Sequence, residues 1–149
     1  MLIAPSSFKA KESGFKELIS FGEQNFLLPS GGIVVRDDLL KSDPAMVEKF
    51  VRASLMGFWF LRDNRPSAVK ALSRSLKVDE PLAAKIYDAA RPTMTQDGSL
   101  SEDAQRRMIA VVVKLRALKE APATDKLFDF SVLKKAQAAL QQRGWKPAP

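Results

Sequence analysis

The sequence predicts an α/β domain that is mostly helical, with five or six helices and two or three short strands. Residues that favour helix starts, such as Asp43, Asp79 and Ser101, each precede a run with apolar residues three or four positions apart. Short β-branched or alternating apolar runs that lie beside proline and glycine occur within the first 35 residues. A chain of 149 residues is long enough to bury one core, so a single soluble domain is expected.

The strand predictions fall on three stretches. Residues 1–5 read as the end of a strand that Pro5 stops, and residues 15–21 alternate weakly between apolar and polar side chains. Residues 26–35 form the third candidate, interrupted by turn residues and completed by the β-branched run 33–35. Because a lone pair of strands is marginal in water, we expect the missing neighbours to come from a second copy or a longer natural protein.

The longest predicted helix begins at Asp43–Pro44 and extends to Leu61. Aspartate accepts hydrogen bonds from the free amides of a first turn, and proline suits the first helical position. One face carries residues spaced i, i+4, i+7, i+8 and i+11, and residues 55–61 are apolar almost all round. This pattern predicts a helix that packs inside something larger than itself. The face comprises Val47, Val51, Ser54, Leu55 and Phe58.

Four further helices are expected after it. One restarts at Asn64–Arg65–Pro66, the next starts at Asp79–Glu80–Pro81 and stops at Arg91–Pro92, and Asp97–Gly98 then makes a turn. Ser101 is expected to cap the third of these helices. Asp129 is expected to cap the last one, with Phe128 packing on Leu133, and this helix ends at Gly144. The apolar stripe predicted for the helix that starts at Ser101 comprises Ala104, Met108, Val111, Leu115 and Leu118.

Composition narrows the function classes. The chain has no cysteine and no histidine, which excludes disulfides and thiolate metal sites and removes the commonest general base and metal ligand. We therefore expect no enzyme, no cofactor and no metal. The net charge of +7 is spread along the chain among acidic residues, which favours a solvated basic surface over nucleic-acid binding. A basic nucleic-acid-binding domain stays an alternative.

The order and spacing of many residues resemble the C-terminal part of bacterial ABC-transporter solute-binding proteins. The group most similar is the nitrate, sulfonate and taurine type, which includes binders of thiamine pyrimidine precursors, and the resemblance runs from about Ile3 to near the end. The residues that carry it are Gly14–Phe15, 29–38, 44–60, 64–69, Arg91–Pro92, Asp97–Gly98, Leu100–Ser101–Glu102 and Asp129–Phe130–Ser131.

The resemblance implies an α/β fragment of a type II periplasmic binding protein fold. Members have two lobes, bind solute in the cleft between them and deliver it to an ABC permease. Residues 1–14 would then be the end of the second lobe with the hinge crossing, and residues 15–149 the C-terminal portion of the first lobe. The full-length family is periplasmic, whereas this chain opens without a signal-peptide pattern and is expected as written to be a cytoplasmic fragment. Such a fragment is expected to bind solute poorly on its own and to form a homodimer.

Two short stretches are candidate ligand sites for a small anionic or heteroaromatic solute. Ser30, Gly31 and Gly32 offer a hydroxyl and exposed amides that suit a sulfonate or carboxylate, although such a stretch is more often a simple bulge or turn that leads into a strand. The resemblance places Pro5 and Ser6 at a strand end facing the cleft; a chain crossing without ligand contact is the alternative. A dimerising helical module without a transport ligand, using its strand edge and apolar helix, is the other function considered.

Two further motifs have structural interpretations. Adjacent acidic residues at Asp37 and Asp38 could hold a metal ion beside Arg36, but such a pair more often caps a helix. Trp59, between two phenylalanines, could stack on a ring, but at this spacing it more often lies in a core or subunit interface.

Overall fold

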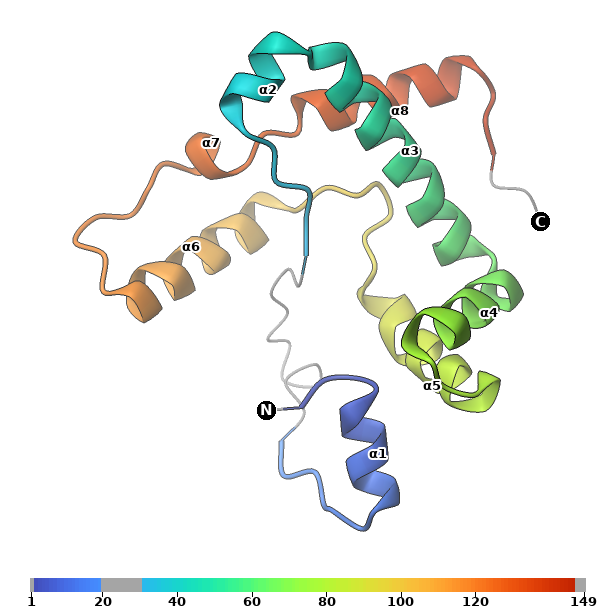
Figure 1. Ribbon diagram of the computed structural model, residues 1–149. Helices are drawn as coiled ribbons and strands as arrows, with labels where there is room; N and C mark the ends of the chain where they lie inside the picture. Colours follow the sequence, from blue (N-terminus) through green and yellow to red (C-terminus); the bar gives the residue numbers. More distant parts are fainter. Residues whose placement is uncertain (1, 20–30, 147–149) are drawn as a thin grey trace. The chain divides into compact units, whose positions relative to one another are not determined.

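The computed structural model describes residues 2–19 and 31–146, and within these ranges every regular element is a helix (Figure 1). The N-terminal part holds α1 (Ser6–Glu12), and α2 (Asp37–Ser42) and the long α3 (Pro44–Asp63) follow. Next come α4 (Arg65–Leu76), α5 (Glu80–Ala90) and a short 3₁₀ turn, η1 (Arg91–Thr93). The C-terminal part holds α6 (Glu102–Arg116), α7 (Thr124–Leu127) and α8 (Ser131–Gln142).

The predicted α/β fold is wrong: over the described part of the chain there is no strand, so the fold is helical rather than a fragment of a type II periplasmic binding fold. Residues 2–5 end in a turn before α1, and residues 15–19 and 31–36 have no regular structure. Residues 20–30, which held parts of two predicted strands, lie outside the described residues. Because β propensity depends on packing against neighbouring strands, a β-branched run such as 33–35 forms no strand without a partner.

The predicted helix starts at Asp43, Asn64, Asp79 and Ser101 are confirmed. Asp43 Oδ1 accepts from the Met46 amide at 3.0 Å, and Asn64 Oδ1 from the Ser67 amide at 3.1 Å. In the same way, Asp79 Oδ1 accepts from the Leu82 amide, and Ser101 Oγ accepts from the Ala104 amide. Each cap satisfies an amide that has no partner inside its own helix, which fixes where the helix begins.

The chain divides into two compact units that share α3. Unit 1 contains α1, the end of α3 from Trp59 onward, α4, α5 and η1; unit 2 contains α2, α3 up to Phe58, α6, α7 and α8. The lobe boundary predicted at residue 14 refers to a longer protein and stays a prediction.

Unit 1 is organised around an antiparallel pair of helices, α4 and α5. The turn between them places Lys77 in the left-handed region at φ 53°, and the Val78 amide donates to the Ser73 carbonyl at 3.1 Å. The two helices enclose a small core of Ala68, Val69, Ala83 and Tyr87. From α1, Glu12 reaches Lys85 of α5 at 3.4 Å.

Unit 2 has its core where α3 meets α8. The buried side chains are Val47, Val51 and Ala136, and Val35, Leu40, Val132 and Leu133 pack against them. The predicted face of α3 is largely confirmed, since Val47, Val51 and Leu55 are buried and Ser54 and Phe58 are half-buried.

The apolar face predicted for α6 is wrong in part. Gln105 and Ile109 are the residues that are buried, whereas Leu115 is 77% exposed. Gln105 is buried because its side-chain amide donates to the Leu100 carbonyl at 2.8 Å, so a polar residue occupies a position that an apolar pattern would not select.

Candidate functional site

The predicted ligand residues lie in two places, one in each unit. Pro5 is half-buried just before α1, and Ser6 is the exposed first residue of that helix. Gly31 and Gly32 are exposed in the irregular segment before α2, and a Cβ atom added at either glycine would meet nothing within 4 Å. Ser30 lies outside the described residues. The two glycines therefore offer an accessible stretch of backbone, as the ligand hypothesis requires.

The segment 31–36 joins unit 2 at its C-terminal end. Val35 packs against the core of α3 and α8, whereas Val34 is 97% exposed. Arg36 Nε donates to Asp38 Oδ1 at 2.9 Å, and the Leu39 amide donates to the same oxygen at 2.9 Å. The guanidinium of Arg36 lowers the pKa of Asp38. Asp37 and Asp38 therefore lie in the first turn of α2, as a helix start requires, but Arg36 holds the cap position and no side chain caps this helix.

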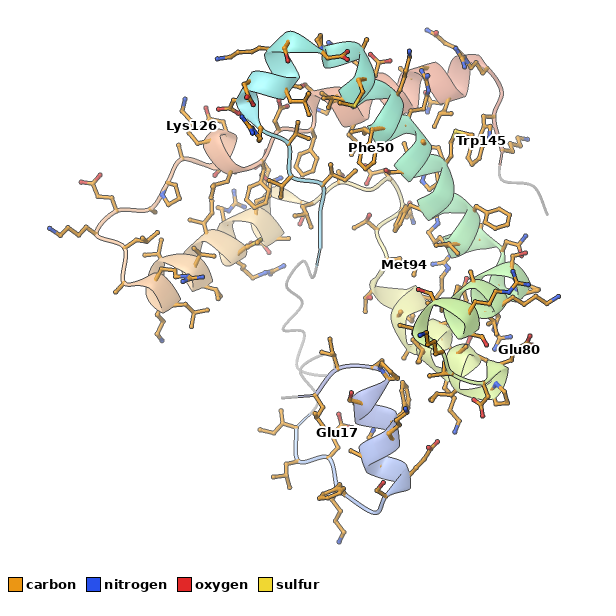
Figure 2. All side chains as sticks on the ribbon, viewed as in Figure 1. Glu17, Phe50, Glu80, Met94, Lys126 and Trp145 are labelled. Carbon is orange, nitrogen blue, oxygen red and sulfur yellow. The ribbon has the colours of Figure 1, made fainter. Side chains whose placement is uncertain are left out.

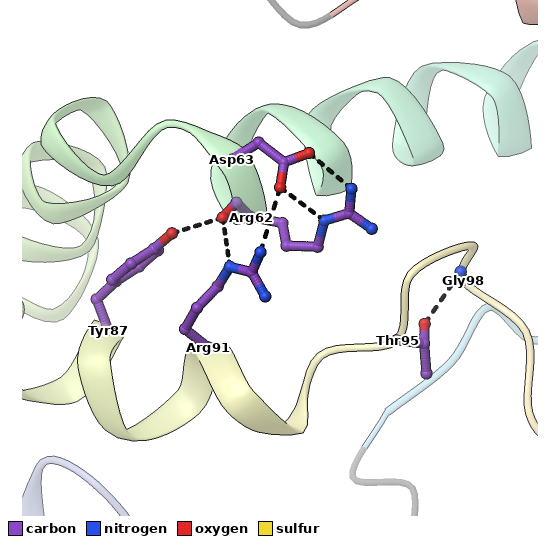
Figure 3. Close-up of polar contacts among 6 residues, drawn as sticks. All are labelled: Arg62, Asp63, Tyr87, Arg91, Thr95 and Gly98. Atoms are coloured by element: carbon purple, nitrogen blue, oxygen red, sulfur yellow. Dashed lines mark hydrogen bonds and ion pairs between the residues drawn. The ribbon is translucent and has the colours of Figure 1, made fainter.

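A polar network joins the end of α3 to α5 and η1 in unit 1 (Figure 3). Tyr87 Oη donates to the Arg62 carbonyl at 2.6 Å, and Arg91 Nε donates to the same oxygen at 2.7 Å. In a continuous helix this carbonyl would accept from residue 66, but Pro66 has no N–H. The two side chains thus supply donors for a carbonyl that the proline would otherwise leave without its helical partner.

The charged members of this network pair with one another. Arg62 Nε donates to Asp63 Oδ1 at 2.8 Å, Arg62 Nη2 to Asp63 Oδ2 at 2.6 Å, and Arg91 Nη2 lies 3.4 Å from Asp63 Oδ1. The hydrogen bonds from Arg62 lower the pKa of Asp63, an effect that Arg91 reinforces. The network therefore fastens the α3–α4 corner to α5 and provides no general base. The sequence-based predictions missed it, although Pro66, four residues after Arg62, was an available signal.

A tight turn at residues 95–99 lies in unit 2, shortly before α6. The Gly98 amide donates to Thr95 Oγ1 at 3.0 Å, drawn in Figure 3, and the Ser99 amide donates to Asp97 Oδ1 at 2.9 Å. Gly98 has φ 82°, and an added Cβ would lie 3.4 Å from a methyl group of Leu55. The Asp97 carbonyl accepts from Gln137 Nε2 at 2.7 Å. Asp97, whose pKa the Ser99 amide lowers, therefore shapes the turn.

Trp59, which was considered for stacking on a ring, and the pair Phe128 and Phe130 lie on or beside helices. Trp59 is half-buried on α3. Phe128 and Phe130 stack on each other, with ring centroids 6.5 Å apart and an interplanar angle of 8°, immediately before α8. Asp129 between them accepts from the Ser131 amide at 2.7 Å, but Phe130 holds the cap position of α8, so the predicted cap at Asp129 is wrong by one residue.

Metal-ligating clusters and membrane-spanning helices are both absent from the part of the chain that the structure describes. Over residues 2–19 and 31–146, no group of three or more potential metal-ligating side chains is close enough to hold an ion. Among the described helices, none has both the length and the apolar character needed to cross a bilayer.

Comparison of the chain with protein-family models, with curated proteins and with solved structures finds no match.

Proposed function

We propose that the chain is part of a non-enzymatic solute-binding component of an ABC importer, for a small anionic solute such as a sulfonate, nitrate or a pyrimidine precursor. The observation that carries the proposal is an ordered series of residues that resembles that family, from Gly14–Phe15 to Asp129–Phe130–Ser131. An ABC permease would be the partner that receives the solute.

The local structure gives several of these residues defined roles. Asn64 and Ser101 cap helices, Asp97 and Gly98 make the turn before α6, and Asp129 accepts from the first amide of α8. Asparagine, aspartate, serine and glycine are favoured at such positions in helical proteins generally, so the resemblance here falls on residues that fix helix boundaries.

The proposed contact with solute lies at Gly31 and Gly32. Both residues are exposed, and a Cβ atom added to either would have no neighbouring atom within 4 Å. An oxyanion could therefore approach their backbone amides closely. Because the described residues form no sheet and hence no cleft of the family type, we expect the affinity of this polypeptide alone to be no better than millimolar, about −4 kcal/mol.

Nuclear magnetic resonance titration with taurine, nitrate and a pyrimidine tests the proposal. We expect at least one of them to shift the amide resonances of Gly31 and Gly32 and their neighbours, at ligand concentrations of about 1 mM or above. The double variant Gly31→Ala/Gly32→Ala should lose these shifts. Gly57→Ala is the matched control, because Gly57 also has open space at Cβ but lies on α3. Absence of shifts with every solute, or shifts that the double variant keeps, would contradict the proposal.

A second function, association of two copies, is favoured by an exposed apolar stripe on α3. Phe50 (labelled in Figure 2) is 56% exposed, Met46 41% and Leu61 38%. The stripe follows the spacing i, i+4, i+7, i+11 and i+15, and its two small members permit close approach of another helix. It comprises Met46, Phe50, Ala53, Gly57 and Leu61, on a different face from the buried Val47, Val51 and Leu55.

Light scattering on a size-exclusion column over a range of concentrations tests this association. We expect a dimer whose dissociation constant rises at least about tenfold in Phe50→Glu, since burying a phenylalanine contributes about 2 kcal/mol. Leu115→Glu is the matched control because Leu115 is also an exposed large apolar residue but lies on α6. A monomer at every concentration, or equal weakening by both variants, would rule out the stripe as the contact.

A further inference from the structure

A cavity of about 490 Å³ lies in unit 2 where the first turns of α3 and α8 meet α2. This volume falls within the range of about 300–1,000 Å³ that is usual for small-molecule sites. Its apolar wall is made by Leu40, Pro44 and Val132, and its polar groups are those of Glu48, Ser131 and Lys135. Gly31 and Gly32 do not line it, so the cavity is separate from the solute contact proposed above.

The cavity carries one carboxylate and one ammonium group on different helices. Glu48 comes from α3 and Lys135 from α8, and no ion pair joins them in the part of the chain that the structure describes. Glu48 has Arg52 as its cationic neighbour, at 3.8 Å, which is too long for a good hydrogen bond. The hydrogen bond from the Ser131 amide lowers the pKa of Asp129, and the positive charge of Lys135 adds to this effect. Glu48 and Lys135 therefore both retain capacity to bind groups of opposite charge.

We propose that this cavity binds a small zwitterion, of the class of ω-amino acids, with its ammonium group at Glu48 and its acidic group at Lys135. Ser131 Oγ adds a hydroxyl that can donate to the acid, and the apolar wall contacts the methylene chain between the two charges. A ligand with both charges neutralises both protein groups at once, whereas a ligand with one charge leaves the other protein group without a partner.

Comparing ligands that carry both charges with ligands that carry only one tests whether binding requires a zwitterion. In calorimetric or resonance titrations of the intact chain we use glycine, β-alanine, 4-aminobutyrate and 6-aminohexanoate, with butyrate and butylamine as single-charge controls. One of the amino acids should bind with a dissociation constant of roughly 1 mM, and the single-charge controls at least about tenfold more weakly. Equal binding of butyrate or butylamine, or no binding by any amino acid, would overturn the proposal.

Variants of the two charged residues test the site itself. Glu48→Gln and Lys135→Gln should each weaken amino-acid binding at least about tenfold. Lys49→Gln and Lys134→Gln are matched controls, because they change charged neighbours that do not line the cavity, and they should bind as the parent chain does. Equal losses in the controls would mean that binding does not depend on the groups that line the cavity, which would overturn the assignment of the two residues.

A charge exchange distinguishes this proposal from simple unfolding. Glu48→Lys and Lys135→Glu should each abolish binding, and the double variant should restore it, because a zwitterion can bind in the reverse orientation. Circular dichroism checks that helix content is kept. A folded double variant that fails to recover binding would overturn the assignment. The test is also independent of the importer proposal, whose readout is the resonances of Gly31 and Gly32.

Discussion

The carbonyl group of Arg62 shows how a proline four residues onward determines which groups donate hydrogen bonds to it. Pro66 removes the amide that this carbonyl would meet in a continuous helix, and Tyr87 and Arg91 donate to it instead. Tyr87 is also 5% exposed and belongs to the core of unit 1, so its ring packs while its hydroxyl closes the corner.

Replacing Tyr87 by phenylalanine should therefore have a limited effect. Tyr87→Phe keeps the ring, and Arg91 still donates to the carbonyl, so the free energy of unfolding should fall by about 1 kcal/mol. In Tyr87→Phe/Arg91→Met the carbonyl loses both donors, and the loss should exceed the sum of the single variants. Urea denaturation of the parent chain and the three variants measures this coupling. Strictly additive losses would show that the two donors act independently.

Asp63 makes the stability of this corner depend on pH. Arg62, and to a lesser degree Arg91, hold its pKa below the usual 3.8, so the folded state binds a proton less readily than the unfolded state does. Its contribution to stability is therefore complete above about pH 4 and is lost as the pH falls through the lowered folded-state value. The difference in unfolding free energy between the parent chain and Asp63→Asn should shrink on acidification, and acid denaturation series of both chains measure it. A difference that grows at low pH would contradict this sign.

At the scale of elements, helix starts could be predicted because their causes are local. Asp43, Asn64, Asp79 and Ser101 each cap an amide three residues onward, so the signal and its target lie within one turn. Strands were not predictable in this way. The run 33–35 has the composition of a strand, but a strand also needs a neighbour that the composition does not supply.

The same distinction explains the other errors. The helices α1 and α7 were missed because 7 and 4 residues are too few to show a repeating apolar pattern. For α2 the acidic pair indicated a helix start, but 6 residues gave no pattern from which to predict its extent. The buried face of α6 was misassigned because Gln105 is buried through a hydrogen bond that depends on tertiary position.

The sequence could indicate which residue types suit a binding site, but not which residues lie together in one. Gly31 and Gly32 are accessible, as a backbone contact with solute requires, but no pattern along the chain indicates that Glu48 and Lys135, far apart in the sequence, line one cavity. Such pairs arise from helix packing, here of α3 on α8 around the buried Val47.

At the scale of the whole molecule, the buried apolar clusters found within residues 2–19 and 31–146 are two small cores that share no buried residue. One lies between α4 and α5 around Val69, and the other between α3 and α8 around Val51. Cores of this size hold their surroundings together only locally, and regions with separate cores often open separately. The two units should therefore respond independently to core mutations, although α3 belongs to both.

Hydrogen exchange measured by nuclear magnetic resonance on a matched pair of variants tests this independence. Val69→Ala and Val51→Ala each remove two methyl groups from a buried position and should cost about 2 kcal/mol. Val69→Ala should speed amide exchange in α4 and α5 and leave α8 unchanged, while Val51→Ala should do the reverse. If either variant instead accelerated exchange to the same extent in α5 and α8, the chain would unfold as one cooperative unit, and the shared helix α3 would be the element that couples the two cores.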